Sequence, residues 1–175
     1  MTCLHPQLYI SVPAEHLQLK IGLAPDPENV SAWVNFHSFV AKVELFVWPT
    51  LAKPTWAVWA LRDAFEQDDY FYKPPAVRDA YVLTAAQYVM WKGQDLMQRI
   101  VHPGDVGALY EQHWAPGPRY HGLARIDMSR WHFWKDGFAA EEAGRGNVSD
   151  EAKAVAGKTV KLMDALEETK GSLPL

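Results

Sequence analysis

Residues 127–138 carry three large aromatic side chains at helical spacing. Trp131, Trp134 and Phe138 are three and four positions apart, and charged residues lie among them. This spacing places the three rings on one face of an α-helix. A related pattern occurs in residues 55–66, where two tryptophans are again three positions apart. The chain is therefore expected to fold as helices that bury aromatic side chains.

Proline, glycine and capping residues divide the chain into further helical segments. Both neighbouring faces of the segment that follows Pro27 are apolar, so we expect this helix to be central. Asp127 or Ser129 is the expected cap of the helix that carries the three aromatic rings, and Ser149 that of the last helix. Helices are predicted over about 26–49, 54–67, 75–103, from 127 or 129 onward and 150–169, with a short turn possible at 106–113.

These segments predict one all-α domain over residues 1–175. It is a bundle of about five to seven helices around an aromatic-rich core. Residues 1–25 and 170–175 are expected to be irregular. A chain of this length can bury a core large enough to need neither disulfides nor a structural metal.

Charge and composition exclude several classes of protein. The net charge of -4 and the lack of a basic patch argue against a nucleic-acid partner. No apolar run reaches the roughly 20 residues that a membrane helix needs, and residues 1–6 do not look like a signal peptide. The only cysteine is Cys3, which cannot form an intramolecular disulfide. The protein is expected to be cytoplasmic, without membrane contact.

Three sequence elements together resemble a known family. They are residues 59–66, residues 85–88 leading to Gly93, and residues 130–134 with Phe138. In this order they are similar to the fungal domain of unknown function 3632 family over roughly residues 30–168. The resemblance implies an all-helical, single-domain protein, some of whose relatives lie near genes for specialised metabolism. It implies no established active site, so no catalytic residue is carried over.

Motifs for several enzyme classes are absent. The sequence has no nucleophile elbow, no phosphate-binding glycine loop, no His-Glu-x-x-His and no cysteine cluster. The four histidines between His102 and His132 do not have the spacing of metal ligands on one helix. We therefore predict no metal site and no cofactor.

Polar residues on apolar or aromatic faces are the candidates for chemistry. His37 shares a face with Val34 and Ala41, where a partly buried imidazole can act as a general acid or base, or can be a satisfied core residue. Arg62, Asp63 and Glu66 form a polar stripe that either faces a substrate or pairs within itself as a surface ion pair. Arg130 either clamps a carboxylate or phenolate, or stacks on a tryptophan and fixes helix packing.

The aromatic residues divide into two groups. Tyr88 and Trp91 share one face, and they are expected to line a pocket with Trp134, while Tyr110 lies on a loop that can cover it. The remaining large rings are expected to fill the core, above all Trp33, Trp56 and Trp131.

Two functions from different classes fit these patterns. The first is a cofactor-independent cyclase or isomerase that folds an apolar, polyketide-like or terpenoid-like substrate in an aromatic pocket. In it His37 is the acid or base, Tyr88 and His132 are donors, and Asp63 is the orienting carboxylate; Arg62, Trp91, Tyr110, Arg130 and Trp134 bind the substrate. The second is a non-catalytic helical interaction module or homodimer whose aromatic stripes form its core or its interface.

Overall fold

The computed structural model describes residues 24–46, 54–103 and 113–169. These ranges contain five α-helices, one 3-10 helix and no β-strand, so the predicted all-α class is confirmed. The elements are α2 (Val30–Phe46), α3 (Thr55–Phe65), η1 (Asp68–Tyr72), α4 (Pro75–Val101), α6 (Met128–Glu142) and α7 (Asp150–Thr169).

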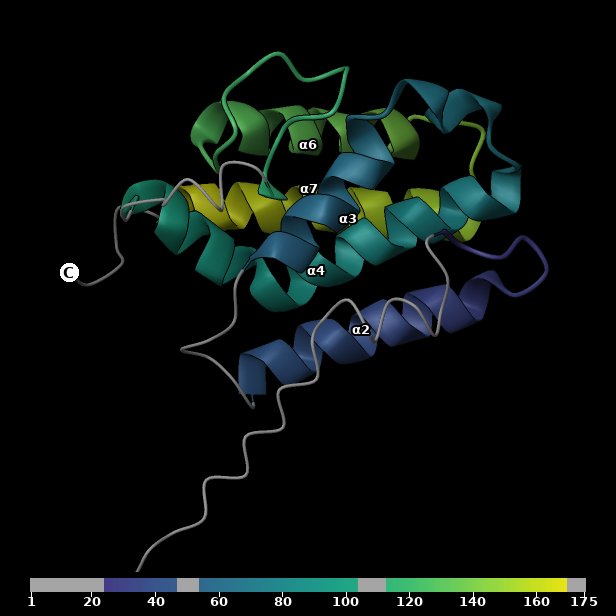
Figure 1. Ribbon diagram of the computed structural model, residues 1–175, viewed down its shortest axis with the longest axis horizontal. Coiled ribbons are helices and arrows are strands. Elements are labelled where there is room, and N and C mark those ends of the chain that lie inside the picture. Colours follow the sequence, from purple (N-terminus) through teal and green to yellow (C-terminus); the bar gives the residue numbers. More distant parts are fainter. Residues whose placement is uncertain (1–23, 47–53, 104–112, 170–175) are drawn as a thin grey trace, which may run out of the picture.

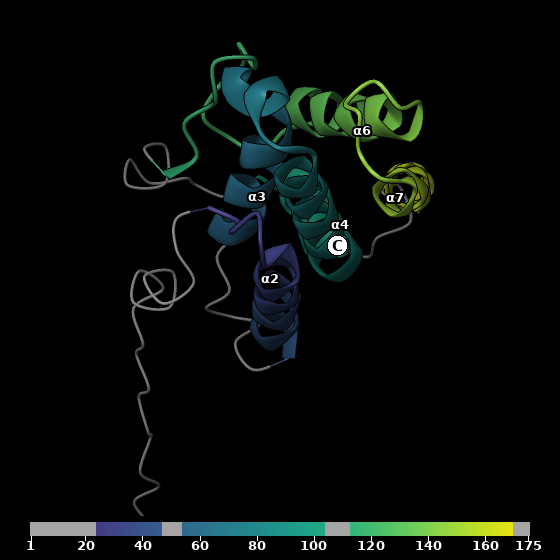
Figure 2. The ribbon, with the colours of Figure 1, turned by 90° about the vertical axis from the view of Figure 1, so that its right-hand side faces the viewer.

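The long helix α4 is the central element of the described residues (Figure 1). It packs against α2, α3 and α7, and α6 packs on α7 and touches α3. Figure 2 shows α2 on the other side of α4 from the pair formed by α6 and α7. The expectation that the helix after Pro27 is central is therefore wrong for these residues. Trp33, His37 and Ala41 form its buried stripe, whereas Phe39 is 61% exposed.

Local capping signals set the starts of the last two helices. The Asp127 carboxylate accepts a hydrogen bond from the backbone N–H of Arg130 at 2.9 Å, so Asp127, not Ser129, caps α6. The hydroxyl of Ser149 accepts a hydrogen bond from the N–H of Ala152 at 3.2 Å and caps α7. Both helices begin where the sequence predicts.

Helix α4 begins at Pro75, where the missing N–H of proline leaves no hydrogen bond unmade. It continues through Gly93, which the sequence predicts as a cap or a kink, and ends at Val101. A Cβ on Gly93 would lie 2.8 Å from Cδ1 of Leu166 on α7. The glycine therefore allows α4 and α7 to approach closely.

The aromatic face of α6 is buried as predicted. Trp131, Trp134 and Phe138 are all 0% exposed. The ring of Phe138 lies edge-on to that of Phe65 on α3, with centroids 4.6 Å apart. A Cβ on Gly137 would lie 2.6 Å from the Phe65 ring, so a glycine is needed where α6 crosses this ring. The predicted core tryptophans, Trp33, Trp56 and Trp131, are also buried.

Some predictions concern residues outside the described ranges. Tyr110, nearly all of the possible turn at 106–113 and almost all of the expected irregular ends fall there. Within the described residues, no helix is both long enough and apolar enough to cross a lipid bilayer.

Candidate functional site

His37 on α2 and Tyr88 on α4 meet in the core. The Nδ1 atom of His37 lies 3.0 Å from the Tyr88 hydroxyl, and the two residues are 5% and 0% exposed. Aromatic rings surround the imidazole, with centroids 4.6 to 5.8 Å away, namely Trp33, Phe36 and Trp56. The structure thus joins two of the four predicted catalytic residues.

Burial favours the neutral form of both groups. It lowers the pKa of His37 to about 4, and it raises the pKa of Tyr88, with the Glu44 carboxylate adding to the rise. The Nε2 atom of His37 is buried and has no hydrogen-bond partner among the described residues. Neither side chain lines the cavity described below. In this position the pair holds α2 against α4. This arrangement agrees with the alternative in which His37 is a core residue with a polar partner.

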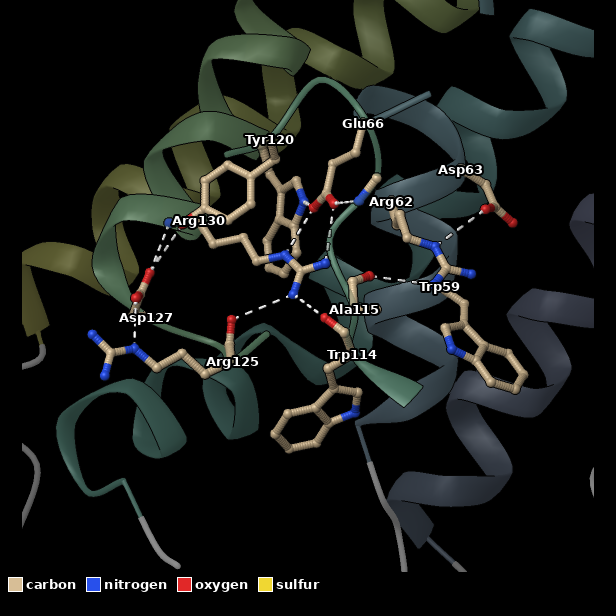
Figure 3. Close-up of polar contacts among 12 residues, drawn as sticks. Trp59, Arg62, Asp63, Glu66, Trp114, Ala115, Tyr120, Arg125, Asp127 and Arg130 are labelled. Atoms are coloured by element: carbon tan, nitrogen blue, oxygen red, sulfur yellow. Dashed lines mark hydrogen bonds and ion pairs between the residues drawn. The ribbon is translucent and has the colours of Figure 1, made fainter. Parts of the chain in front are cut away.

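Arg62 and Asp63 lie beside each other on α3 (Figure 3). Their Nε and Oδ1 atoms are 3.8 Å apart, and the side chains are 26% and 38% exposed. Arg62 also donates to the carbonyl of Ala115 at 3.4 Å. Burial raises the pKa of Asp63, and the charges of Arg62 and Lys73 oppose the rise. Because more than a third of the Asp63 side chain is exposed, water moderates this shift.

Glu66 forms an ion pair with Arg130, a residue distant in the sequence (Figure 3). The pairing with Arg62 that the polar stripe allowed is not formed. Both residues are 0% exposed. Arg130 donates from Nε and Nη2 to the two carboxylate oxygens at 2.8 and 3.0 Å. The carboxylate also accepts from the Trp134 indole at 2.7 Å and from the Gly117 backbone at 2.8 Å. The remaining Arg130 nitrogen donates to the Trp114 carbonyl at 2.7 Å.

This network has little capacity left for a ligand. Arg130 does clamp a carboxylate and lies 5.2 Å from the Trp134 ring, but the carboxylate is the protein's own. The contacts join α3, α6 and the segment between α4 and α6. The Glu66 carbonyl also accepts from the Arg119 backbone at 3.0 Å, and a Cβ on Gly117 would lie 2.5 Å from that carbonyl oxygen. The network therefore fixes where residues 117–119 lie.

The other predicted residues are dispersed. His132 is half exposed on α6, and its Nε2 atom lies 3.5 Å from a carboxylate oxygen of Glu167 on α7. Trp91 on α4 is half-buried; its indole donates to Gln87 at 3.3 Å, and the Lys42 ammonium lies 4.9 Å from its ring. The predicted residues thus form separate local contacts and do not line one common site among the described residues.

A cavity of about 320 Å³ lies elsewhere, between the C-terminal end of α3, η1 and the second half of α6. These elements meet in the upper part of Figure 1. Its volume is at the lower end of the range for small-molecule sites. The rings of Phe65, Phe71 and Phe133 form apolar walls, and Tyr70 and Glu141 supply polar groups. We call this cavity the Tyr70–Glu141 pocket.

Two buried polar atoms without a hydrogen bond in the described part of the chain belong to residues that line this pocket. By distance and angle the Tyr70 hydroxyl and one carboxylate oxygen of Glu141 form no hydrogen bond, although both are buried and the two groups lie close enough to shift each other's pKa; the residues are only 1% and 4% exposed. Arg78 on α4, 7% exposed, has a buried Nε in the same condition, and its charge acts on both groups. An unpaired buried polar group costs about 1–3 kcal/mol. Such a cluster is expected where a ligand or ordered water completes the hydrogen bonds.

The environment of the pocket favours a protonated carboxyl group. Burial raises the pKa of Glu141, while the nearby Tyr70 hydroxyl and the charges of Arg78 and Arg119 oppose the rise. Burial also raises the pKa of Tyr70, and the carboxylate of Glu141 adds to the increase. Glu141 therefore keeps its proton to a higher pH than a surface glutamate and can act as a proton donor.

None of the eight predicted site residues that the structure describes lines this pocket. Residues 67–70 and Pro74–Pro75 indicate only a break between helices, so Tyr70 carries no signal of its own. One signal is present in α6. Glu141 follows Trp134 by seven positions and Phe138 by three, so a carboxyl group continues a buried aromatic face.

Comparison with known proteins identifies a family. No curated protein and no solved structure matches the chain significantly. The family described as "Protein of unknown function (DUF3632)" matches the chain over residues 15–138. This span begins and ends earlier than the 30–168 expected from the resemblance, and it includes Tyr70, Phe71 and Arg119 but not Glu141. Because this match covers well over half of the chain, the chain belongs to the DUF3632 family.

Proposed function

We propose that this protein binds a small, mostly apolar molecule in the Tyr70–Glu141 pocket and acts on it as a cofactor-independent isomerase or cyclase. One observation carries the proposal. A cavity of about 320 Å³ with aromatic walls also holds the buried Tyr70 hydroxyl and Glu141 carboxyl, which have polar atoms without a partner in the described residues. In native structures such groups are expected to meet a ligand, an ordered water or a reacting group.

Proton transfer is the chemistry that the pocket supports best. In a β,γ-unsaturated ketone, Glu141 donates a proton to the carbonyl oxygen while the Tyr70 hydroxyl donates a hydrogen bond to it. The carboxylate of Asp136, which also lines the pocket, accepts a proton from the neighbouring carbon. Loss of the α-proton gives a dienol; delivery of that proton to the γ-carbon, and return of the oxygen-bound proton to Glu141, re-forms the carbonyl and moves the double bond into conjugation, with no net gain or loss of atoms or electrons.

This proposal keeps the predicted class of reaction but places it on other residues. The catalytic roles predicted for His37, Asp63, Tyr88 and His132 stay predictions. His37 and Tyr88 are enclosed by aromatic rings, and His132 contacts Glu167 at the surface. The unpartnered groups of the Tyr70–Glu141 pocket are better placed to meet a substrate.

Binding can be tested with the neutral fluorescent probe N-phenyl-1-naphthylamine. Ala140 lines the pocket and is half-buried, so Ala140→Phe places a ring in the cavity, while Ala140→Ser leaves the volume nearly unchanged. We expect the wild type and Ala140→Ser to bind the probe and Ala140→Phe to bind it at least about tenfold more weakly, because filling a preformed cavity excludes the ligand. Absence of binding to the wild type, or equal binding to Ala140→Phe, would refute the pocket.

Proton transfer can be tested with 2-tetralone, an apolar bicyclic ketone with acidic C–H bonds. Its hydrogen–deuterium exchange in D₂O is followed by NMR. We expect the wild type to exceed the buffer rate and Glu141→Gln to return to it. Tyr70→Phe should slow exchange, because it removes the hydroxyl that donates a hydrogen bond to the carbonyl oxygen of the substrate. A wild type no faster than buffer, or a Glu141→Gln variant as fast as wild type, contradicts the proton-transfer step.

A second candidate function is a helical interaction module. Phe71 and Tyr72 in η1 are 51% and 90% exposed beside the pocket, as expected for a partner or homodimer surface. Sedimentation velocity over a range of concentrations tests it. Association that Tyr72→Ser abolishes, but that Met90→Ser on the outer side of α4 does not, would favour this function.

A further inference from the structure

The arginines of the described residues fall into two groups. Four of the seven arginines in the sequence form ion pairs with carboxylates, at 2.8 to 3.8 Å, namely Arg62, Arg99, Arg125 and Arg130. The other three, Arg78, Arg119 and Arg145, form no ion pair within the described part of the chain. All three adjoin the Tyr70–Glu141 pocket: Arg119 and Arg145 line it, and the charge of Arg78 acts on Tyr70 and Glu141.

This distribution is not explained by a shortage of acids, because the chain has 21 acidic and 17 basic residues. Arg119 is held in place by neutral groups. Its guanidinium donates to the Phe65 carbonyl at 3.3 Å and lies 5.4 Å from the Phe71 ring, while its backbone is bound to Glu66. The side chain is thus oriented but has no carboxylate partner in the described residues.

Arg145 lies directly beyond the end of α6 and is exposed. Its backbone N–H donates to the Ala140 carbonyl at 3.0 Å, which fixes the start of the side chain at the pocket. The acids that line the same pocket are Asp136, which is exposed, and Glu141, which is buried. Arg78 lies nearby on α4 with a buried Nε that lacks an acceptor in the described ranges.

A guanidinium without an acid partner is suited to bind a planar anion such as a carboxylate through two parallel hydrogen bonds. We infer that the ligand of the Tyr70–Glu141 pocket is an amphiphilic anion, with an apolar ring body between Phe65 and Phe133 and a carboxylate held by Arg119 and Arg145. The inference rests on the proposed function and names the class of its substrate. A keto acid with an apolar ring meets both requirements.

The test distinguishes recognition of the charge from binding of the apolar rings. It uses N-phenyl-1-naphthylamine as the reporter and two competitors. 2-Naphthoate and 2-naphthamide have the same rings, and only the first carries a charge. We expect naphthoate to displace the reporter from the wild type at a concentration about tenfold lower than naphthamide, because the guanidinium–carboxylate contact is charge-assisted. Arg145→Gln should weaken naphthoate about fivefold and leave naphthamide and the reporter unchanged.

Lys161→Gln is the matched control, since it removes one positive charge from an exposed site on α7. It should leave both competitors unchanged. Arg119→Gln gives a second variant with the same expected direction, and Arg145→Lys should restore part of the naphthoate affinity. Equal displacement of the reporter by naphthoate and naphthamide, or equal effects of Arg145→Gln and Lys161→Gln on naphthoate, would refute the inference that the ligand is an anion. The proposal that the pocket binds an apolar molecule would then still stand. If the reporter does not bind the wild type, the proposed function and this inference both fail.

Discussion

The buried Glu66–Arg130 pair makes a sharp prediction about stability. Glu66→Gln keeps the shape of the side chain but replaces one acceptor oxygen with an NH₂ group. The carboxylate accepts four hydrogen bonds at 2.7 to 3.0 Å, two at each oxygen. In the variant, two of these donors face another donor, and the Arg130 charge loses its counter-ion. Both residues are 0% exposed, so water cannot take over these contacts.

The size of the effect follows from these contacts. Two unpaired buried donors cost about 2–6 kcal/mol at about 1–3 kcal/mol each, and removing one partner of a buried ion pair costs about 3–5 kcal/mol. We expect the free energy of unfolding to fall by about 3–5 kcal/mol. For a chain of this length, the melting temperature should fall by about 6–20 °C. Urea unfolding followed by circular dichroism measures the first quantity, and a thermal scan the second.

Asp63→Asn provides the matched control on the same helix. It removes the same type of charge from a pair whose atoms are 3.8 Å apart and whose Asp63 side chain is 38% exposed. Exposed pairs contribute about 0–1 kcal/mol, so this variant should stay within about 1 kcal/mol of wild type. If Glu66→Gln costs no more than Asp63→Asn, the buried network does not hold α3, α6 and the segment at Gly117 together, and the reasoning fails.

Two further predictions concern glycine packing and pH. Gly137→Ala should lower the free energy of unfolding by about 1–3 kcal/mol, because its Cβ would lie 2.6 Å from the Phe65 ring. Gly157→Ala should be neutral or stabilising, because its Cβ would meet only the end of a flexible acidic side chain. Urea unfolding measures both differences. His37 has a pKa of about 4 in the folded protein against 6.5 for an unperturbed histidine, so the unfolded chain binds more protons between these values and stability falls as pH falls. From pH 7 to pH 5 the free energy of unfolding of the wild type should fall by about 2 kcal/mol relative to that of His37→Gln. Comparing the two proteins cancels the effect of Glu44, whose raised pKa changes stability in the opposite direction. Parallel plots of unfolding free energy against pH for the two proteins would contradict the prediction.

The start of each later helix could be predicted because its signal acts locally. Pro75, Asp127 and Ser149 satisfy or remove backbone donors within three residues of their own position. The aromatic spacing of α6 likewise predicts which of its faces is buried. The central position of α4 could not be predicted this way, because apolar patterning shows that a helix face is covered but not by how many neighbours.

The candidate site was much less predictable. Asp63 and Glu66 are equivalent members of one polar stripe in the sequence, yet one is partly exposed and the other fully buried. The difference depends on Arg130, which is 64 positions from Glu66. Similarly, Tyr70 and Glu141 acquire their significance only because η1 and α6 meet at one cavity.

By itself, the sequence determined the helical class, the starts of the last three helices and the buried aromatic face of α6, because these depend on backbone hydrogen bonds and periodicity over a few residues. Only the tertiary structure decided which charges pair, which polar atoms of the described residues stay without partners and where a cavity remains. Those properties depend on distances between residues far apart in the chain, and burial then sets how strongly each charge and hydrogen bond acts.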